Sequence, residues 1–215
     1  MHIALIGASG FIGSALRKEA LSRGHGVTAL VQHPDKLAGD DHGNGKLRAV
    51  KADVLDPALA AQLKGHDAVI SAFSGHAQSD IYDYYLRGIR AIIRATQEAG
   101  VPRLLVVGGA GSLEVAPGLQ VVDTPEFPAQ WKATAEGARE ALKLLQQETH
   151  LDWTMLSPSA HIAPGQRTGN FRLGTDQLLV DKSGESHISL EDYAVAMIDE
   201  LENPVHPRQR FTVGY

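Results

Sequence analysis

The chain has 215 residues, 43% of them hydrophobic, which is enough for one large domain or two small ones. It has no cysteine, which excludes disulfides, thiol catalysis and thiolate-bound metals and fits a reducing compartment, so we expect a cytoplasmic protein. The formal net charge is −5 without a basic block, so nucleic acid is not an expected partner. The first apolar run is too short for a signal peptide or a membrane span, and no membrane partner is expected.

Short apolar runs alternate with helical patterns along the whole chain. In chain order we expect a strand at 3–6, a helix at 11–22, strands at 27–31 and 47–51, a helix at 57–63, a strand at 68–72, a helix at 81–99, a strand at 104–107, a helix at 129–147, a strand at 153–156, a helix at 189–201 and a strand at 211–213 that closes the sheet edge. This alternation predicts an α/β fold, a Rossmann-type doubly wound parallel sheet with helices on both faces. We expect a single domain over residues 1–215, with ligands bound outside the carboxyl ends of the strands.

Two stretches lack the pattern of regular elements. Residues 39–45 are polar and rich in glycine, which predicts an exposed loop. Residues 158–185 are rich in Gly, Pro, Thr and Ser, and the surrounding segment 157–188 is expected to form a small substrate pocket or lid.

A glycine-rich turn follows the first predicted strand directly and opens a helix. Its spacing is G-x-x-G-x-x-G, and the residues expected to bind a cofactor there are Gly7, Ser9, Gly10, Phe11, Ile12 and Gly13. The first glycine permits a tight turn, the second lets the backbone approach a pyrophosphate, and the third lets helix and strand pack closely. The start of the helix then offers free amides to the phosphates, so the turn predicts a bound nicotinamide dinucleotide.

The turn resembles that of extended and atypical short-chain dehydrogenases/reductases. Later segments are similar to a narrower group, the NADH–flavin-reductase-like NAD(P)H-binding proteins, which are related to biliverdin reductase B and to the NmrA-like proteins. The segments that carry the resemblance are 51–56, 107–113, 152–158, 165–169 and 188–194. The resemblance runs nearly from end to end and implies the same fold and an NAD(P)H-dependent activity.

The cofactor type is read at the end of the second strand, where NAD-selective sites commonly carry an acid. The chain has Gln32 there, followed by His33, and Lys36 lies nearby. Because no acidic residue is present at this position to repel a 2′-phosphate, the sequence favours NADP over NAD. All three residues also suit an exposed loop. The resemblance implies that Asp53 and the Val54 amide contact the adenine, whereas Asp53 could instead cap a turn with Asp56.

The expected chemistry follows from a missing pair of residues. Carbonyl-reducing members of this class use a tyrosine with a lysine four residues later, and none of the five tyrosines here has one. Hydride transfer from nicotinamide C4 to flavin N5 has no such need, because solvent can protonate the product nitrogen. The sequence therefore favours a planar, flavin-like acceptor.

Candidate residues for this chemistry follow the later strands. The resemblance to the related reductases implies that Ser112 lies near the nicotinamide and His161 near the acceptor, whereas Ser112 could instead be a plain turn residue and His161 could have no role. Ser74 and His76 are candidates for the ribose or nicotinamide, Lys132 for ribose or phosphate, and Arg167 for an anionic substrate or for stacking on one, while each also suits a structural position. No histidine spacing predicts a metal site.

Three functions remain open from the sequence. The leading hypothesis is an NAD(P)H-dependent oxidoreductase that reduces a flavin or another small planar molecule. The alternative is an NmrA-like redox sensor that binds NAD(P) without turnover, and an epimerase is the third. By analogy, the helices at 81–99 and 129–147 are candidates for a homodimer face.

Overall fold

The computed structural model describes residues 1–37 and 45–215, so the predicted loop at 39–45 lies outside the described residues apart from Gly45. One eight-stranded sheet organises the chain, in the order β10-β12-β8-β5-β4-β1-β2-β3. Its strands are β1 (His2–Ile6), β2 (Gly26–Val31), β3 (Leu47–Lys51), β4 (Ala68–Ser71), β5 (Arg103–Val107), β8 (Asp152–Ser157), β10 (Arg172–Gly174) and β12 (Gln209–Gly214). The sheet confirms the predicted Rossmann-type class.

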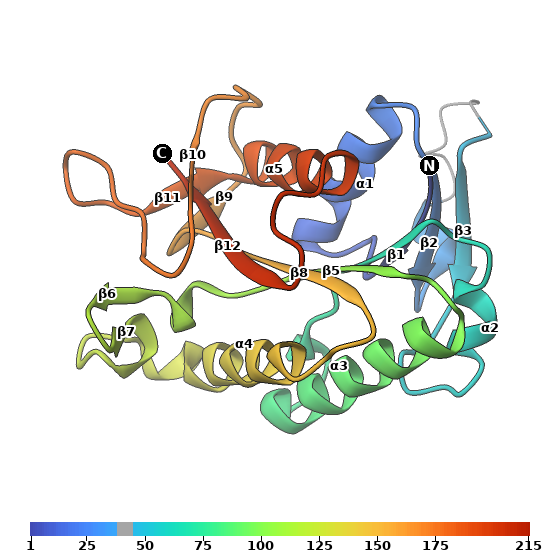
Figure 1. Cartoon of the computed structure of the whole chain (residues 1–215), viewed down its shortest axis with the longest axis horizontal. Helices are drawn as coiled ribbons and strands as arrows, with labels where there is room; N and C mark the ends of the chain where they lie inside the picture. The colour runs from blue at the N-terminus through green and yellow to red at the C-terminus, as the bar shows by residue number, and fades with distance from the viewer. Residues whose placement is uncertain (38–44) are drawn as a thin grey trace.

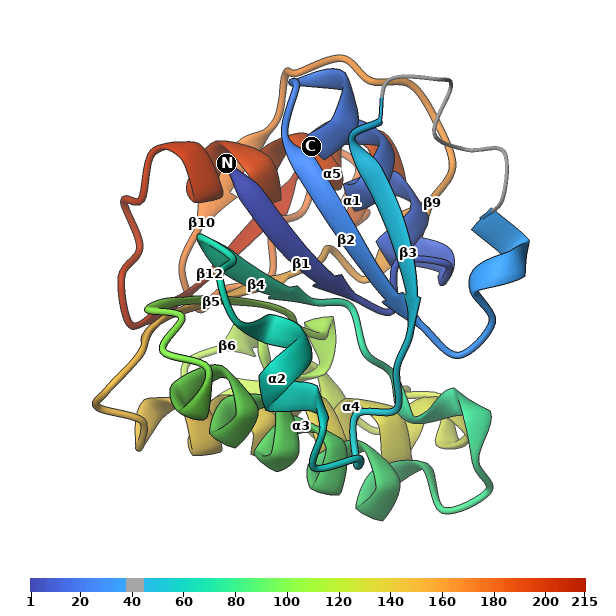
Figure 2. The ribbon, with the colours of Figure 1, turned by 90° about the vertical axis from the view of Figure 1, so that its right-hand side faces the viewer.

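Helices cover both faces of the sheet (Figures 1 and 2). α1 (Phe11–Ser22) and α5 (Leu190–Glu202) lie on one face, and α2 (Leu59–Leu63), α3 (Ile81–Glu98) and α4 (Ala129–Gln146) lie on the other. β1 pairs in parallel with β2 on one side and with β4 on the other, so the order in which successive strands are added to the sheet reverses between β1 and β4. In this topology the ligand crevice lies at the carboxyl ends of these two strands.

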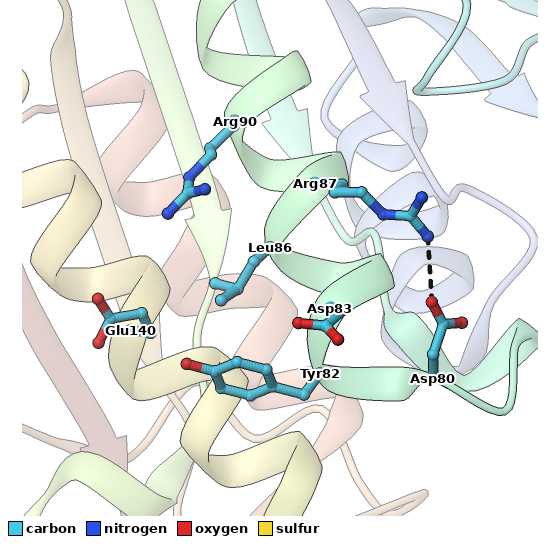
Figure 3. Close-up of a pocket in the computed structure, with 7 residues that line it drawn as sticks. All are labelled: Asp80, Tyr82, Asp83, Leu86, Arg87, Arg90 and Glu140. Carbon is cyan, nitrogen blue, oxygen red and sulfur yellow. Dashed lines mark hydrogen bonds and ion pairs between the residues drawn. The ribbon is translucent and has the colours of Figure 1, made fainter.

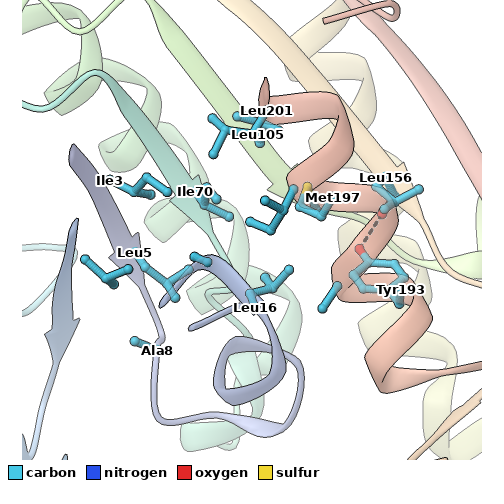
Figure 4. Close-up of a cluster of buried hydrophobic side chains, with 14 of the residues drawn as sticks. Ile3, Leu5, Ala8, Leu16, Ile70, Leu105, Leu156, Tyr193, Met197 and Leu201 are labelled. Atoms are coloured by element: carbon cyan, nitrogen blue, oxygen red, sulfur yellow. Dashed lines mark hydrogen bonds between the residues drawn. The ribbon is translucent and has the colours of Figure 1, made fainter. Parts of the chain in front are cut away.

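A continuous apolar core lies between the sheet and the α1–α5 layer (Figure 4). Leu5 of β1, Leu16 of α1 and Met197 of α5 are almost completely buried in it. The Tyr193 ring is also buried, and its hydroxyl donates to the Leu156 carbonyl at 2.8 Å. A second core lies under α3 and α4 and contains Tyr85. The dense packing fixes the strand ends that carry the site.

The sheet edge differs from the prediction. Residues 211–213 do form a strand, but β12 is not the edge, because β10 pairs with it on the outer side in antiparallel register. The predicted pocket segment thus contributes a strand to the main sheet. It also contains β9 (His161–Ala163) and β11 (His187–Ser189), which pair with each other in parallel.

Short elements fill the connections at the carboxyl side of the sheet. They are the 3₁₀ helices η1 (Pro34–Leu37), η2 (Gly75–Ala77), η3 (Ala110–Ser112) and η4 (Val121–Asp123), and the hairpin of β6 (Glu114–Ala116) and β7 (Leu119–Gln120). Among the described residues, no helix has the length and apolar character that crossing a membrane requires.

Candidate cofactor and acceptor site

The glycine turn after β1 is folded so tightly that side chains would not fit. Gly7 has φ +77°, and a Cβ there would lie 2.6 Å from the Ala72 carbonyl oxygen. A Cβ on Gly13 would lie 2.1 Å from the Gly7 carbonyl oxygen. These contacts are with backbone atoms that cannot move aside, so both positions need glycine. The turn brings α1 directly against the ends of β1 and β4.

The start of α1 is open to a ligand. Gly10 is its N-cap, has no side chain that caps the helix, and is exposed together with Ser9 and Phe11. The first intrahelical bond runs from the Ser14 amide to the Gly10 carbonyl at 2.9 Å, so the preceding amides have no acceptor within the helix. Free amides and the helix dipole suit a diphosphate. The turn therefore fits the pyrophosphate of a dinucleotide.

The expected adenosine end lies beside β2 and β3. Gln32 is exposed immediately after β2. The Asp53 carboxylate accepts from the Leu55 amide at 2.9 Å, so a turn-capping bond is present, and its adenine contact stays a prediction. Val54 is buried in the second core, so any contact with adenine would come from its backbone. Burial, and then the nearby Asp53 carboxylate, raise the pKa of Tyr84.

Ser74 and Lys132 lie on the other side of the turn. Ser74 precedes η2 at the end of β4, and Lys132 lies in the first turn of α4; both are exposed. Beside Lys132, the ring of Trp131 meets His76 of η2 edge-on, with ring centroids 6.2 Å apart. η2, in the loop that follows β4, is therefore in contact with the first turn of α4.

Ser112 occupies a different environment from the other candidates. It is 2% exposed, and its hydroxyl accepts from the Arg210 guanidinium at 3.2 Å. Arg210 also donates to Asp176 at 3.0 Å. This cluster places the hydroxyl beneath the surface rather than among the exposed candidates, so its role at the nicotinamide stays a prediction.

His161 is exposed on β9, above the end of β8. Its amide donates to the Ser186 carbonyl at 3.0 Å, and it stands opposite His187 in the β9–β11 pair. The structure therefore fixes its backbone and leaves its side chain open to solvent. Its proposed contact with the acceptor stays a prediction.

Two of the shared motifs form one anchor for the pocket segment. Asp192, at the start of α5, accepts from the Thr168 and Gly169 amides at 2.8 Å each and from the Tyr215 hydroxyl at 2.7 Å. The Ser189 hydroxyl donates to the Gln166 carbonyl at 2.8 Å. Ser189 also caps α5 by accepting from the Asp192 amide, while the Asp192 carboxylate holds the 165–169 loop.

Arg167 makes a bidentate ion pair with Glu19 of α1, with both distances 2.8 Å. Its hydrogen bonds, and then those of Arg23, lower the pKa of the Glu19 carboxyl against the opposing effect of burial. Arg167 therefore has a structural contact in this structure, because its guanidinium is paired with Glu19. Through this pair the loop is attached to the helix that carries the open amides.

An Asp192→Asn substitution should loosen this anchor. Burial by itself would raise the pKa of the Asp192 carboxyl, but the hydrogen bonds from Thr168, Gly169 and Tyr215 lower it overall. Because the folded pKa is depressed, the stabilisation is present at neutral pH and is lost as the pH falls through the folded pKa. We expect a loss of about 1.5–3 kcal/mol in the free energy of unfolding at neutral pH, shrinking below about pH 4.

Urea unfolding across a pH series measures this effect. Asp35→Asn, at an exposed position, is the matched control and should change little. A deficit in Asp192→Asn that stays constant down to low pH would show that the charge has no part in the anchor.

Two grooves mark the surface. One, of about 560 Å³, runs along α1 from Ser9 and Phe11 to Pro164 and Arg167. The other, of about 600 Å³, lies between α3 and α4 and is lined by Asp80, Tyr82, Asp83, Leu86, Arg87, Arg90 and Glu140 (Figure 3). No predicted site residue lines the second groove. Among the described residues, no group of His, Asp or Glu side chains could hold a metal ion.

Comparison with known proteins identifies the class. The NAD(P)H-binding family model matches residues 7–204, so the chain belongs to this family of atypical short-chain dehydrogenases/reductases. It is 44% identical to YwnB of Bacillus subtilis over 99% of this chain and 98% of that protein.

Solved structures show the same relationship. A Bacteroides thetaiotaomicron protein, named provisionally as an epimerase, is 49% identical with a TM-score of 0.92 and covers 100% of this chain and 96% of its own. A Streptococcus pneumoniae protein, named provisionally as an NADH-flavin reductase, is 34% identical with a TM-score of 0.86 and covers 100% and 99%. The fold is shared end to end, while the names disagree about the reaction.

Sequence reasoning overlooked several residues that the structure brings to the site. Trp131 is one of them, and a large aromatic side chain at a predicted helix start is the signal that could have identified it. The anchoring roles of Asp192 and Tyr215 depend on contacts with residues more than 20 positions away, and no local pattern predicts them.

Proposed function

We propose that this protein is an NAD(P)H-dependent reductase that transfers hydride to a flavin or another planar acceptor. The observation that carries the proposal is the uncapped start of α1 at Gly10, held at the carboxyl ends of β1 and β4. The family membership supports nicotinamide cofactor binding at this place. The similarity to the pneumococcal protein supports a flavin as acceptor.

The chain's residues would hold the reactants rather than exchange protons with them. The amides of Phe11, Ile12 and Gly13 bind the diphosphate, and Gln32 faces the adenosine ribose. The reduced nicotinamide supplies the hydride when it is bound. Ser74, which precedes η2, and Lys132 of α4 would hold the ribose of the nicotinamide. Solvent supplies the proton that completes the reduced acceptor.

The tyrosines argue against the epimerase and alcohol dehydrogenase alternatives. Epimerisation needs an acid and a base placed at the sugar. Tyr84, Tyr85 and Tyr193 are buried, and Tyr215 hydrogen bonds to Asp192. None lies on α4 beside Lys132. The same feature favours the redox sensor as a second candidate, because a sensor needs no proton relay at all.

Turnover separates these candidates. Purified protein with NADPH or NADH should oxidise the nucleotide when FMN or riboflavin is added without oxygen, and the flavin should bleach at the same rate. Calorimetry should give binding of both nucleotide forms. Binding that strongly prefers one redox form, with no stimulation by any flavin or quinone, would replace the reductase with the sensor.

The preference for NADP can be tested at Gln32. A Gln32→Asp substitution puts a carboxylate at the exposed end of β2, where it would repel a 2′-phosphate and accept the ribose hydroxyls of NAD. We expect the NADPH-to-NADH affinity ratio to fall about tenfold, the effect of about 1.4 kcal/mol. Lys143→Gln, which removes an exposed positive charge in α4, is the control; an unchanged ratio in Gln32→Asp would move the ribose site elsewhere.

Three further expectations accompany the proposal. We propose that residues 157–188 close over the acceptor, and that the protein is cytoplasmic, where nicotinamide nucleotides are reduced. A homodimer through α3 and α4 is tested by light scattering, with Arg90→Glu in the groove of Figure 3 as the disrupting variant.

A further inference from the structure

An exposed aromatic pair stands at the end of the crevice that the cofactor turn does not occupy. The Trp131 and His76 rings are 6.2 Å apart and nearly perpendicular, at 87°. Trp131 is nevertheless 51% exposed, and His76 is exposed as well. A large aromatic surface left open beside a ligand crevice is unusual, because burying such a ring is strongly favourable.

The pair is held by close packing around one buried ring. A Cβ on Gly75, next to His76, would lie 3.1 Å from the Tyr85 Cβ and 2.4 Å from the Ile81 carbonyl oxygen. A Cβ on Gly137 of α4 would lie 3.2 Å from the Tyr85 ring. η2 and α4 are thus both pressed against Tyr85, which stacks on Phe73 at 5.9 Å.

η3 fixes α4 from the other side. A Cβ on Gly111 would lie 2.6 Å from the Ala135 Cβ, so η3 packs directly on the helix one turn after Trp131. The first turn of α4 therefore stands at a fixed position beside the loop that follows β5. Trp131 has a rigid base although its ring is exposed.

The position of the pair relates it to the reactive end of the cofactor. Gly7 touches Ala72, and His76 follows only four residues later on the same loop. The expected adenosine contacts, Gln32 and Asp53, lie beyond β2 on the opposite side of the turn. A dinucleotide that crosses α1 with its diphosphate must therefore direct its nicotinamide toward η2 and α4.

We propose that Trp131, positioned by His76, is the surface on which the planar acceptor stacks against the nicotinamide. This inference rests on the proposed reductase function and names its acceptor class, a flat aromatic ring system. The nearly perpendicular contact with the imidazole positions the indole, and the exposed part of the indole remains available for stacking.

Flavin fluorescence provides a readout that would not change if Trp131 had only a structural role. An indole stacked on a flavin quenches flavin emission at contact distance, and the other tryptophan, Trp153, is 2% exposed within β8 and cannot make that contact. FMN would be titrated with wild type, Trp131→Leu, Trp131→Phe and the control Lys143→Ala, all saturated with NADP⁺. Anisotropy measures binding and intensity measures stacking.

We expect wild type and Lys143→Ala to quench bound FMN. Trp131→Leu should lose the quenching and raise the KM for FMN roughly tenfold, with kcat less affected and NADPH affinity unchanged. Trp131→Phe should recover most of the KM, and His76→Ala should give an intermediate KM.

Distinct outcomes separate the stacking surface from the proposed reductase function on which it rests. If Trp131→Leu binds, quenches and turns over FMN as the wild type does, the stacking surface is refuted and the reductase stands. If wild type quenches FMN but never oxidises NADPH, the stacking surface stands and the reductase falls. If NADPH is oxidised only with acceptors that have no aromatic ring, the stacking surface is refuted.

Discussion

Replacing Gly10 with aspartate should abolish dinucleotide binding without destabilising the protein. The backbone of Gly10 is extended, with φ −76° and ψ 178°, which aspartate adopts readily at an N-cap. Its carboxylate would accept the free amides of the first turn and would place a negative charge where the diphosphate binds. We expect affinity for NADPH and NADH to fall at least about 100-fold, equivalent to about 2.7 kcal/mol.

The substitution should lower nucleotide affinity but not stability, so a loss of binding could not be attributed to misfolding. Thermal unfolding should give a Tm equal to or above that of the wild type, while calorimetry gives no binding. Gly10→Ser is the matched control, because it shares the 3.2 Å approach of Cβ to the Gly7 oxygen but carries no charge. A Gly10→Asp variant with wild-type affinity would place the diphosphate away from α1 and remove the basis of the proposed function.

The largest stability effect is expected at the amino end of β5, which is the end of the strands away from the cofactor turn. Glu200 of α5 is 3% exposed and accepts from Arg103 at 2.9 Å, from the His206 ring at 2.8 Å and from the His206 amide at 3.0 Å. Burial lowers the pKa of the Arg103 guanidinium, although Glu200 acts in the opposite direction. Glu200→Ala would leave a buried cation without its partner, at a cost of about 3–5 kcal/mol.

Chemical denaturation measures this loss directly. Glu98→Ala removes a pair with Arg94 that is 3.8 Å long and exposed, and it should change the free energy of unfolding by less than about 0.5 kcal/mol. The folded fraction of Glu200→Ala should still bind NADPH normally, because Arg103 begins β5 and lies far along the strand from the crevice. A loss below about 1 kcal/mol would mean that the buried pair contributes no net stability.

The local features of the fold were predictable from the sequence. The bounds of α1 match the predicted 11–22, and α3 ends at Glu98, one residue before the predicted end, because Gly100 and Pro102 mark the stop. The cofactor turn was predictable because its glycine spacing is short and its cause is steric. β10 was missed since Arg172–Gly174 is three residues without an apolar run, and only its partner β12, far along the chain, makes it a strand.

The candidate site was less predictable because it depends on contacts between distant segments. The burial of Ser112 is completed by Arg210, which is 98 positions away. The 165–169 and 188–194 motifs were recognised separately, but their hydrogen bonds to each other appear only in three dimensions. The pairing of His76 with Trp131 likewise joins η2 and α4, which no sequence pattern connects.

The margins of the main sheet bear on how copies of this chain can associate. One margin is β10, only three residues long and led by Arg172, and the other is β3, which carries Arg48 and ends on the exposed Lys51. Short, positively charged outer strands resist pairing with a neighbouring molecule, because like charges would be brought together along the new ladder. Concentrated solutions should therefore resist fibril formation, and self-association should proceed through helices rather than by extension of the sheet.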